Sequence, residues 1–175
     1  MENIKKKPQT VFLLCGCPGS GKSTWINERY IWDYDALISR DAIRFAKLKP
    51  GQDYFAVEDE VKKEFFEEIA KATDPNSKSV FENVFIDATH ISPKTRSDVR
   101  KHIKGRPYQI AVSFEVPVEV AIERNAQRTG RAFVPENAIH NMANRYIAPS
   151  LKEGFDEIWH INAEGIITKE VKKYE

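Results

Sequence analysis

The chain has 175 residues, of which 41% are apolar and 30% charged, and its formal net charge is +1. This length and composition predict one soluble globular domain, because no apolar run reaches the roughly 18 residues that a membrane-spanning helix needs. The near-zero charge excludes a broad positive field that would hold long nucleic acid by its phosphates. The amino-terminal segment lacks the apolar stretch of a signal peptide, and Cys15 and Cys17 are too few for a disulfide framework. We therefore expect a cytoplasmic protein with reduced thiols.

Five short apolar runs alternate with helical patterns along the chain. The runs cover Thr10–Cys15, Ala36–Ser39, Val84–Ala88, Gln109–Val116 and Glu157–Asn162. Strands that alternate with helices predict an α/β fold, in which a parallel five-stranded sheet carries helices on both faces. We expect residues 1–175 to form this single domain. The last segment, Ile166–Lys173, is compatible with an edge strand or with a helix.

Each of the longer predicted helices has its own signal. Apolar residues at helical spacing predict a helix over about 53–72. Ser92 followed by Pro93 is typical of a helix start, and Gly105 is typical of the end of that helix. A further helix is expected over about 117–130, after a Val-Pro pair and before a glycine.

The segment Gly16–Ser23, with the sequence GCPGSGKS, matches the phosphate-binding P-loop motif G-x-x-x-x-G-K-[ST]. An apolar strand precedes it and a helix-compatible run follows, which is the context that the motif requires. The glycines let backbone N–H groups turn toward an anion, Lys22 brings positive charge to the outer phosphates, and Ser23 offers a hydroxyl to Mg²⁺. The predicted ATP site takes in Gly16, Cys17, Pro18, Gly19, Ser20, Gly21, Lys22, Ser23 and Thr24.

A magnesium ion bound by a P-loop usually needs a carboxylate at the end of a neighbouring strand. The apolar run that begins at Val84 ends in such an acid, Asp87. We expect Asp87 and Ser23 to serve the metal. The alternative is that Asp87 only starts a turn, which is a common use of aspartate.

Phosphoryl transfer also needs a carboxylate that can accept the proton of the attacking hydroxyl. Asp41 follows the second predicted strand, at the carboxyl edge of the sheet, where ligands bind in open α/β folds. Arg44 lies one helical turn further on, where it can hold a phosphate or orient the acceptor. The pair can equally be a helix cap and its partner, and both roles can hold together.

A second basic group lies in the segment 124–135, which we interpret as a lid. Arg124 and Arg128 are four residues apart, on one face of the predicted helix, and Arg131 follows in a glycine-containing loop. Clustered arginines of this kind suit a lid that closes on the transferring phosphoryl oxygens. The alternative is an exposed helix whose arginines pair with Glu119 and Glu123.

The densest basic stretch is Lys94–Arg106. It is most simply a solvated helix face, since charge runs usually are. The alternative is a short basic funnel for a nucleic-acid end, lined by Lys94, Arg96 and Arg100.

Taken together, these residues resemble the kinase domain of the bacteriophage 5′-polynucleotide kinase, a nucleic-acid repair enzyme of the P-loop kinase superfamily. The resemblance spans nearly the whole chain. It is carried by GCPGSGKSTW at 16–25, SRDAIR at 39–44, FIDATHISPKTR at 85–96, VPVEVAIERNAQRTGRAFVP at 116–135 and EGFDEIW at 153–159. The combination of R-D-x-x-R with R-N-x-x-R in a lid is more specific than the P-loop, which many kinases share.

The resemblance implies a role for each matching residue. Lys22 and Ser23 would serve ATP and Mg²⁺, Asp41 would activate the 5′-hydroxyl, and Arg44 would contact the terminal phosphate of the acceptor. Arg128 would stabilise the transferring phosphoryl group. Arg131 is assigned to the nucleotide, and Thr89 and Arg124 are assigned to the acceptor. The phage enzyme also has a phosphatase domain, which we do not expect in this chain.

The leading hypothesis is an ATP-dependent kinase that phosphorylates the 5′-hydroxyl end of DNA or RNA. Two alternatives remain open. The same scaffold carries kinases of small hydroxylated molecules, which would keep Asp41 and change the acceptor pocket. A module that binds a nucleotide without transferring phosphate would lose nothing when Asp41 is replaced.

Overall fold

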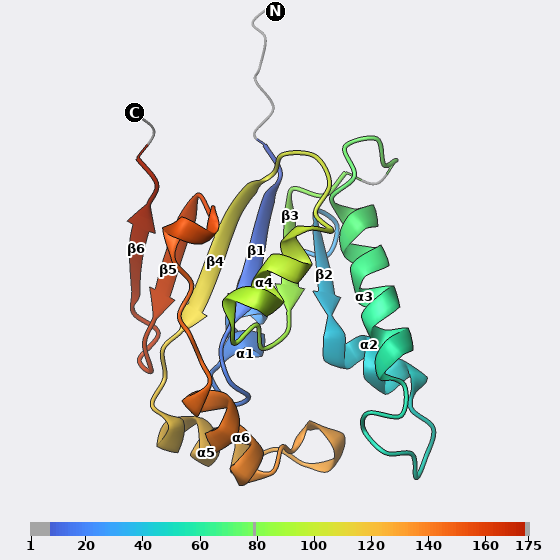
Figure 1. Ribbon diagram of the computed structural model, residues 1–175, viewed down its shortest axis with the longest axis vertical. Coiled ribbons are helices and arrows are strands. Elements are labelled where there is room, and N and C mark those ends of the chain that lie inside the picture. The colour runs from blue at the N-terminus through green and yellow to red at the C-terminus, as the bar shows by residue number, and fades with distance from the viewer. Residues whose placement is uncertain (1–7, 79, 174–175) are drawn as a thin grey trace, which may run out of the picture.

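Six strands form one sheet through the centre of the molecule in the computed structural model, which describes residues 8–78 and 80–173 (Figure 1). The strands are β1 (Thr10–Cys15), β2 (Asp35–Ser39), β3 (Asn83–Asp87), β4 (Tyr108–Phe114), β5 (Glu157–Ile161) and β6 (Ile167–Val171). Their order in the sheet is β2-β3-β1-β4-β5-β6. Neighbouring strands from β2 to β5 run parallel, as the alternation of strands and helices predicts.

The sheet has six strands, so the expectation of five is wrong by one. The segment near the carboxyl end, whose sequence is compatible with an edge strand or a helix, forms strand β6. This strand pairs antiparallel with β5. A tight turn makes the reversal possible: the Asn162 side chain accepts hydrogen bonds from the amides of Glu164 and Ile166, at 3.1 and 2.8 Å. Gly165 adopts a positive φ of 80° in the same turn, a conformation that favours glycine.

Helices cover both faces of the sheet. On one face α3 (Glu58–Ala72) and α4 (Pro93–Arg100) pack over the strands (Figure 1), and α1 (Lys22–Asn27) covers the other face. Side chains of β1 alternate between these two cores: Leu13 packs with the α3 side, and Leu14 packs with Trp25 of α1. Both sides of β1 are therefore buried, which explains its continuous apolar sequence.

The structure shortens the predicted helices. Helix α3 begins at Glu58 rather than near Asp53, because the Asp53 side chain accepts a 2.8 Å hydrogen bond from the Phe55 amide and forms a turn. Ser92 caps α4 as predicted, but the helix ends at Arg100 instead of at the glycine five residues later. The remaining helices are α2 (Arg40–Lys47), α5 (Val118–Ala126) and α6 (Glu136–Asn144), with short 3₁₀ turns at Gly130–Ala132 (η1) and Leu151–Glu153 (η2).

The carboxyl ends of the parallel strands gather at one edge, at the bottom of Figure 1, where α5 and α6 also lie. The P-loop leaves β1 at this edge and α2 leaves β2 there. This is where open α/β sheets bind their ligands. None of the described helices is both long and apolar enough to cross a membrane.

Candidate active site

The P-loop follows β1 and is tied to the segment after β3. The Gly16 amide donates a 2.9 Å hydrogen bond to the Thr89 carbonyl, so the role of Thr89 visible in the structure is a backbone one. Lys22 curls back over the loop, and its Nζ donates to the carbonyls of Gly16 and Cys17, each at 2.9 Å. Burial lowers the pKa of Lys22, and the nearby Asp87 opposes that shift. The loop thus holds a cation where the motif needs one.

The P-loop has no room for a side chain at Gly19. Its φ is 81°, and a Cβ built on it would lie 2.1 Å from the Ala121 carbonyl oxygen in α5. Helix α5 therefore packs directly on the P-loop, and a substitution would push the two apart. This contact sets α5, whose last residues begin the predicted lid, directly against the phosphate site.

The charged residues predicted for catalysis gather around Lys22. The electrostatic influences on the Lys22 pKa include those of Asp87, Arg128 and Asp41. Burial raises the pKa of Asp87, while Lys22 lowers it and Asp41 raises it further. The Ser39 hydroxyl donates a 3.3 Å hydrogen bond to Asp87 Oδ2. The structure therefore brings the predicted metal ligand, base and lid arginine into one electrostatic group with the P-loop lysine.

Asp41 stands at the centre of a network that the sequence alone did not reveal. Arg44 Nη1 donates to Asp41 Oδ1 at 3.0 Å and to the Tyr54 hydroxyl at 2.8 Å. The Tyr54 hydroxyl in turn donates to Asp41 Oδ1 at 2.7 Å. Glu58 forms an ion pair with Arg44 and another with Arg40. The Asp41 side chain stays 62% exposed while that of Arg44 is 5% exposed, so a fixed carboxylate faces solvent.

Asp41 is not the cap of α2, so that structural alternative is wrong. The N-cap is Ser39, whose hydroxyl accepts a 3.4 Å hydrogen bond from the Ala42 amide. Ser39 therefore begins α2 and contacts Asp87 with the same oxygen, which links the strand ends of β2 and β3. Asp41 lies in the first turn, where a negative charge is favourable.

Arg44 is more enclosed than the resemblance implies. The whole residue is 4% exposed, and both terminal nitrogens already have protein partners in Asp41, Tyr54 and Glu58. In the structure Arg44 orients Asp41. Its contact with an acceptor phosphate remains a prediction and would require Tyr54 or Glu58 to give way.

The predicted lid runs from the end of α5 through η1 into α6. Helix α5 ends at Ala126, so Arg128 lies beyond it, and the expectation that Arg124 and Arg128 share a helix face is wrong. Arg124 Nη2 donates a 2.8 Å hydrogen bond to the Ala163 carbonyl and lies near Gly21 of the P-loop. Arg131 Nη1 reaches the Leu48 carbonyl at 3.4 Å. The three arginines thus have separate surroundings.

Asn125 anchors the lid, and the sequence analysis missed it. Its side-chain Nδ2 donates to the Val134 carbonyl at 2.7 Å, and its Oδ1 accepts from the Val134 amide at 3.2 Å. Asn125 is 2% exposed and lies one turn after the buried Ala121. A polar residue on the buried face of an amphipathic helix was the available signal, because such a residue needs specific partners.

A family model described as an AAA domain, AAA_33, matches residues 11–149. The chain belongs to the AAA_33 family. The transcription factor bHLH140 of Arabidopsis thaliana is 25% identical over 177 residues. That match covers 97% of our chain but 18% of the plant protein, so the chain spans under a fifth of this curated relative.

Solved structures show that this AAA_33 chain has the P-loop kinase fold. A chain of the Pnkp1/Rnl/Hen1 RNA repair complex matches with a TM-score of 0.65 and 24% identity, over 83% of our chain and 46% of that one. A fungal RNA kinase matches with a TM-score of 0.56 and 15% identity, over 97% of our chain and 77% of that one. A gluconokinase from Sinorhizobium meliloti 1021 matches with a TM-score of 0.55 and 17% identity, over 90% of our chain and 85% of that one.

The basic stretch of this AAA_33 chain is neither a nucleic-acid funnel nor a purely solvated face. Arg96 is fully buried, and its Nε and Nη2 each bond a carboxylate oxygen of Glu153 at 2.8 Å. Arg100 Nε donates to the Gln109 side chain at 2.8 Å. The proposed funnel of Lys94, Arg96 and Arg100 is therefore wrong, because two of its arginines hold α4 to the rest of the protein.

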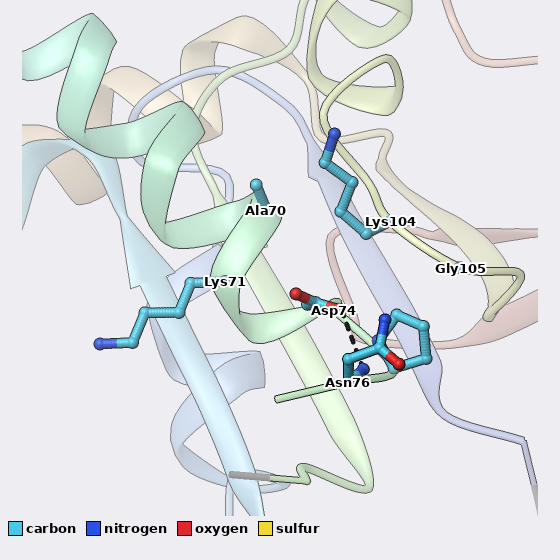
Figure 2. Close-up of a pocket in the computed structure, with 7 residues that line it drawn as sticks. Ala70, Lys71, Asp74, Asn76, Lys104 and Gly105 are labelled. Carbon is cyan, nitrogen blue, oxygen red and sulfur yellow. Dashed lines mark hydrogen bonds between the residues drawn. The ribbon is translucent and has the colours of Figure 1, made fainter. Parts of the chain in front are cut away.

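The surface hollow drawn in Figure 2 is not the candidate active site. It is lined by residues at the end of α3 and before β4, including Lys71, Asp74 and Gly105. These segments lie at the amino edge of the sheet, opposite the P-loop. The candidate site instead lies at the carboxyl edge, where the charged groups converge.

The donor set at this edge fits Mg²⁺ bound together with a nucleotide. The two predicted ligands, Ser23 and Asp87, would offer a hydroxyl and a carboxylate. The described residues contain no group of three or more His, Cys, Asp or Glu side chains that would enclose a metal alone. Magnesium suits such a sparse site, because it keeps several waters and takes further oxygens from phosphates.

Proposed function

We propose that this protein transfers the γ-phosphoryl group of ATP to the 5′-hydroxyl end of a polynucleotide. The observation that carries the proposal is the exposed Asp41 carboxylate, fixed by Arg44 and Tyr54 and electrostatically coupled to Lys22 of the P-loop. A carboxylate so held beside a phosphate-binding loop is suited to accept the proton of an attacking hydroxyl.

Each side chain has a distinct task in this proposal. Asp41 orients the hydroxyl of the acceptor and takes its proton. Lys22 and Arg128 offset the negative charge of the transferring phosphoryl group. As the lid of residues 124–135 closes, Arg131 borders the nucleotide and Arg124 borders the acceptor. Magnesium held by Ser23 and Asp87 would neutralise phosphate charge when bound with ATP.

Two observations support a polynucleotide acceptor. The sequence blocks around Asp41 and in the lid resemble those of the bacteriophage 5′-polynucleotide kinase. The fold is also similar to that of the RNA repair complex and the fungal RNA kinase. The similar gluconokinase fold makes a small hydroxylated acceptor the competing proposal.

The test is transfer of labelled γ-phosphate from ATP with Mg²⁺ to an oligonucleotide that ends in a 5′-hydroxyl. We expect label on the wild-type product and a loss of about 10²- to 10⁴-fold for Asp41→Asn, with ATP affinity retained. An exposed residue at the opposite edge, Trp32, gives the control Trp32→Ala, which should transfer normally. Transfer to gluconate-like small alcohols, with none to oligonucleotides, would overturn the polynucleotide assignment.

A further inference from the structure

An aromatic pair lies directly beside the candidate base. Tyr54 and Phe55 meet edge to face, with ring centroids 5.0 Å apart and planes at 86°. Phe55 is 66% exposed, so much of its ring is open to solvent. The Tyr54 hydroxyl lies 2.7 Å from Asp41 Oδ1, so this exposed ring is connected to the catalytic carboxylate through one neighbouring side chain.

The pair is held in place rather than loosely attached. The Arg44 guanidinium lies over the Tyr54 ring at 4.3 Å from its centroid, and also donates to the Tyr54 hydroxyl. The backbone of Phe55 is fixed by the hydrogen bond from its amide to the Asp53 side chain. Its carbonyl accepts from the Glu58 amide at 3.0 Å, just where α3 begins. The Phe55 ring therefore stands on a fixed backbone beside a fixed tyrosine, which lowers the entropy cost when a flat ligand stacks on it.

We infer that Phe55 is the stacking surface for the terminal base of the acceptor, with Tyr54 as its anchor. This inference rests on the proposed function and names how the same site recognises a nucleotide end. A nucleoside whose 5′-oxygen meets Asp41 carries its base one sugar away from the carboxylate. The exposed Phe55 ring is joined to Asp41 through Tyr54 alone, whose hydroxyl lies 2.7 Å from Asp41 Oδ1 and whose ring centroid lies 5.0 Å from that of Phe55. Aromatic rings bind bases through their faces, without needing a particular sequence.

The lid lies next to the loop that carries the aromatic pair. Arg131 reaches the Leu48 carbonyl at the start of that loop. Arg96 is buried and Arg100 is held by internal hydrogen bonds, so a basic funnel on α4 does not provide the acceptor contacts. A single stacked base supplies recognition of one chain end and needs little positive charge, which agrees with the net charge of +1.

The experiment compares two oligonucleotides that differ only at the 5′-terminal residue, one with an ordinary base and one with an abasic sugar. Both keep the 5′-hydroxyl. For Phe55→Ala we expect KM for the ordinary end to rise at least about fivefold, while KM for the abasic end stays unchanged. Phe55→Leu keeps an apolar side chain without a flat face and should behave like Phe55→Ala, whereas Phe55→Tyr should retain the wild-type values.

Each outcome has a separate meaning. An equal rise in KM for both oligonucleotides, or no rise for either, overturns the stacking inference and leaves the kinase proposal intact. No transfer by the wild-type protein to either oligonucleotide overturns the kinase proposal and the inference that rests on it. Trp32→Ala serves as the control for removing an exposed aromatic ring, since Trp32 is 81% exposed and lies before β2 at the opposite edge of the sheet.

Discussion

At the scale of single residues, the two oxygens of Asp41 have different surroundings. Among the described residues, the hydrogen bonds that Asp41 accepts from Arg44 and Tyr54 both go to Oδ1. This leaves Oδ2 to meet the hydroxyl of the acceptor. The same arrangement fixes the orientation of the carboxylate, because both donors hold one oxygen in place.

Removing the Tyr54 hydroxyl tests this arrangement. Tyr54→Phe keeps the ring and its contact with Phe55 but deletes the hydrogen bond to Asp41. We expect kcat at neutral pH to fall about three- to tenfold. Burial and Asp41 raise the Tyr54 pKa to about 12, so this hydroxyl is protonated and donates to Asp41 at neutral pH.

An unchanged kcat in Tyr54→Phe would show that the hydroxyl only supports the loop. A matched control is Phe45→Leu, because Phe45 also packs against the Tyr54 ring, with centroids 6.4 Å apart, but has no hydroxyl. That variant should leave kcat close to the wild-type value. The contrast separates the hydrogen bond to Asp41 from the packing of the Tyr54 ring.

At the scale of secondary-structure elements, the lid depends on Asn125. Its two hydrogen bonds to the backbone of Val134 tie the end of α5 to the residues just before α6, which fixes both ends of the segment between these helices. Asn125→Ala leaves both Val134 groups without these partners, and we expect kcat to fall about tenfold and unfolding stability to drop by about 1–3 kcal/mol. Asn125→Asp retains the acceptor for the Val134 amide and should lose less.

Hydrogen exchange provides the direct measurement of this anchor. The amide of Val134 should exchange faster in Asn125→Ala than in the wild type, since its hydrogen bond is gone. Strand β1, on the far side of the P-loop, should keep its protection. Unchanged exchange at Val134 together with a reduced kcat would contradict the anchoring role and point to a direct effect on the chemistry.

The sequence predicts which strands and helices form more accurately than it predicts where they begin and end or which side chains they contact. The strand β1 has its predicted bounds because an apolar run is a local signal. The start of α3 is misjudged because the Asp53 turn satisfies backbone groups that a helix would otherwise use. Arg96 is misjudged for a different reason: its partner Glu153 is 57 residues away, and no local pattern reveals such a pair.

At the scale of the whole molecule, the parallel topology explains why separate motifs form one site. Ser39 and Asp87 end strands that are neighbours in the sheet, and they are register partners. The P-loop leaves β1, which lies next to β3. The alternation of strands and helices predicts that these ends share an edge, so Lys22 and Asp87 are found together as expected. Tyr54 falls within the segment 53–72 that is predicted as a helix, but it lies in the turn before α3, and its approach to Asp41 follows only from the folded structure.

The folded molecule also buries His90, whose protonation makes the free energy of unfolding depend on pH. His90 is 4% exposed and adopts a positive φ of 41° after β3. Its Nδ1 lies 2.6 Å from the Leu14 carbonyl, which can only accept, so Nδ1 carries the proton and Nε2 is a bare acceptor. Nε2 is buried and has no hydrogen-bond partner among the described residues. Protonating it would bury a charge among the cations Lys22, Arg40 and Arg96.

This burial lowers the His90 pKa to about 4 from the ordinary value of 6.5. As the pH falls from 6.5 to 4, the unfolded chain takes up a proton that the folded chain refuses, so the folded state loses stability. The loss from His90 reaches up to about 3 kcal/mol near pH 4 and does not grow below it. Burial raises the Asp87 pKa, which gives the opposite slope, so the wild type must be compared with a variant that differs only at His90.

The comparison uses His90→Asn, because asparagine tolerates a positive φ and can still donate to Leu14. We expect the free energy of unfolding in urea to fall less steeply between pH 6.5 and 4.5 in His90→Asn than in the wild type. His140→Asn is the control, since it also removes one histidine but at a side chain that is 47% exposed. Parallel curves for the wild type and His90→Asn would mean that a water or a local opening satisfies His90 Nε2, and that acid sensitivity arises elsewhere in the molecule.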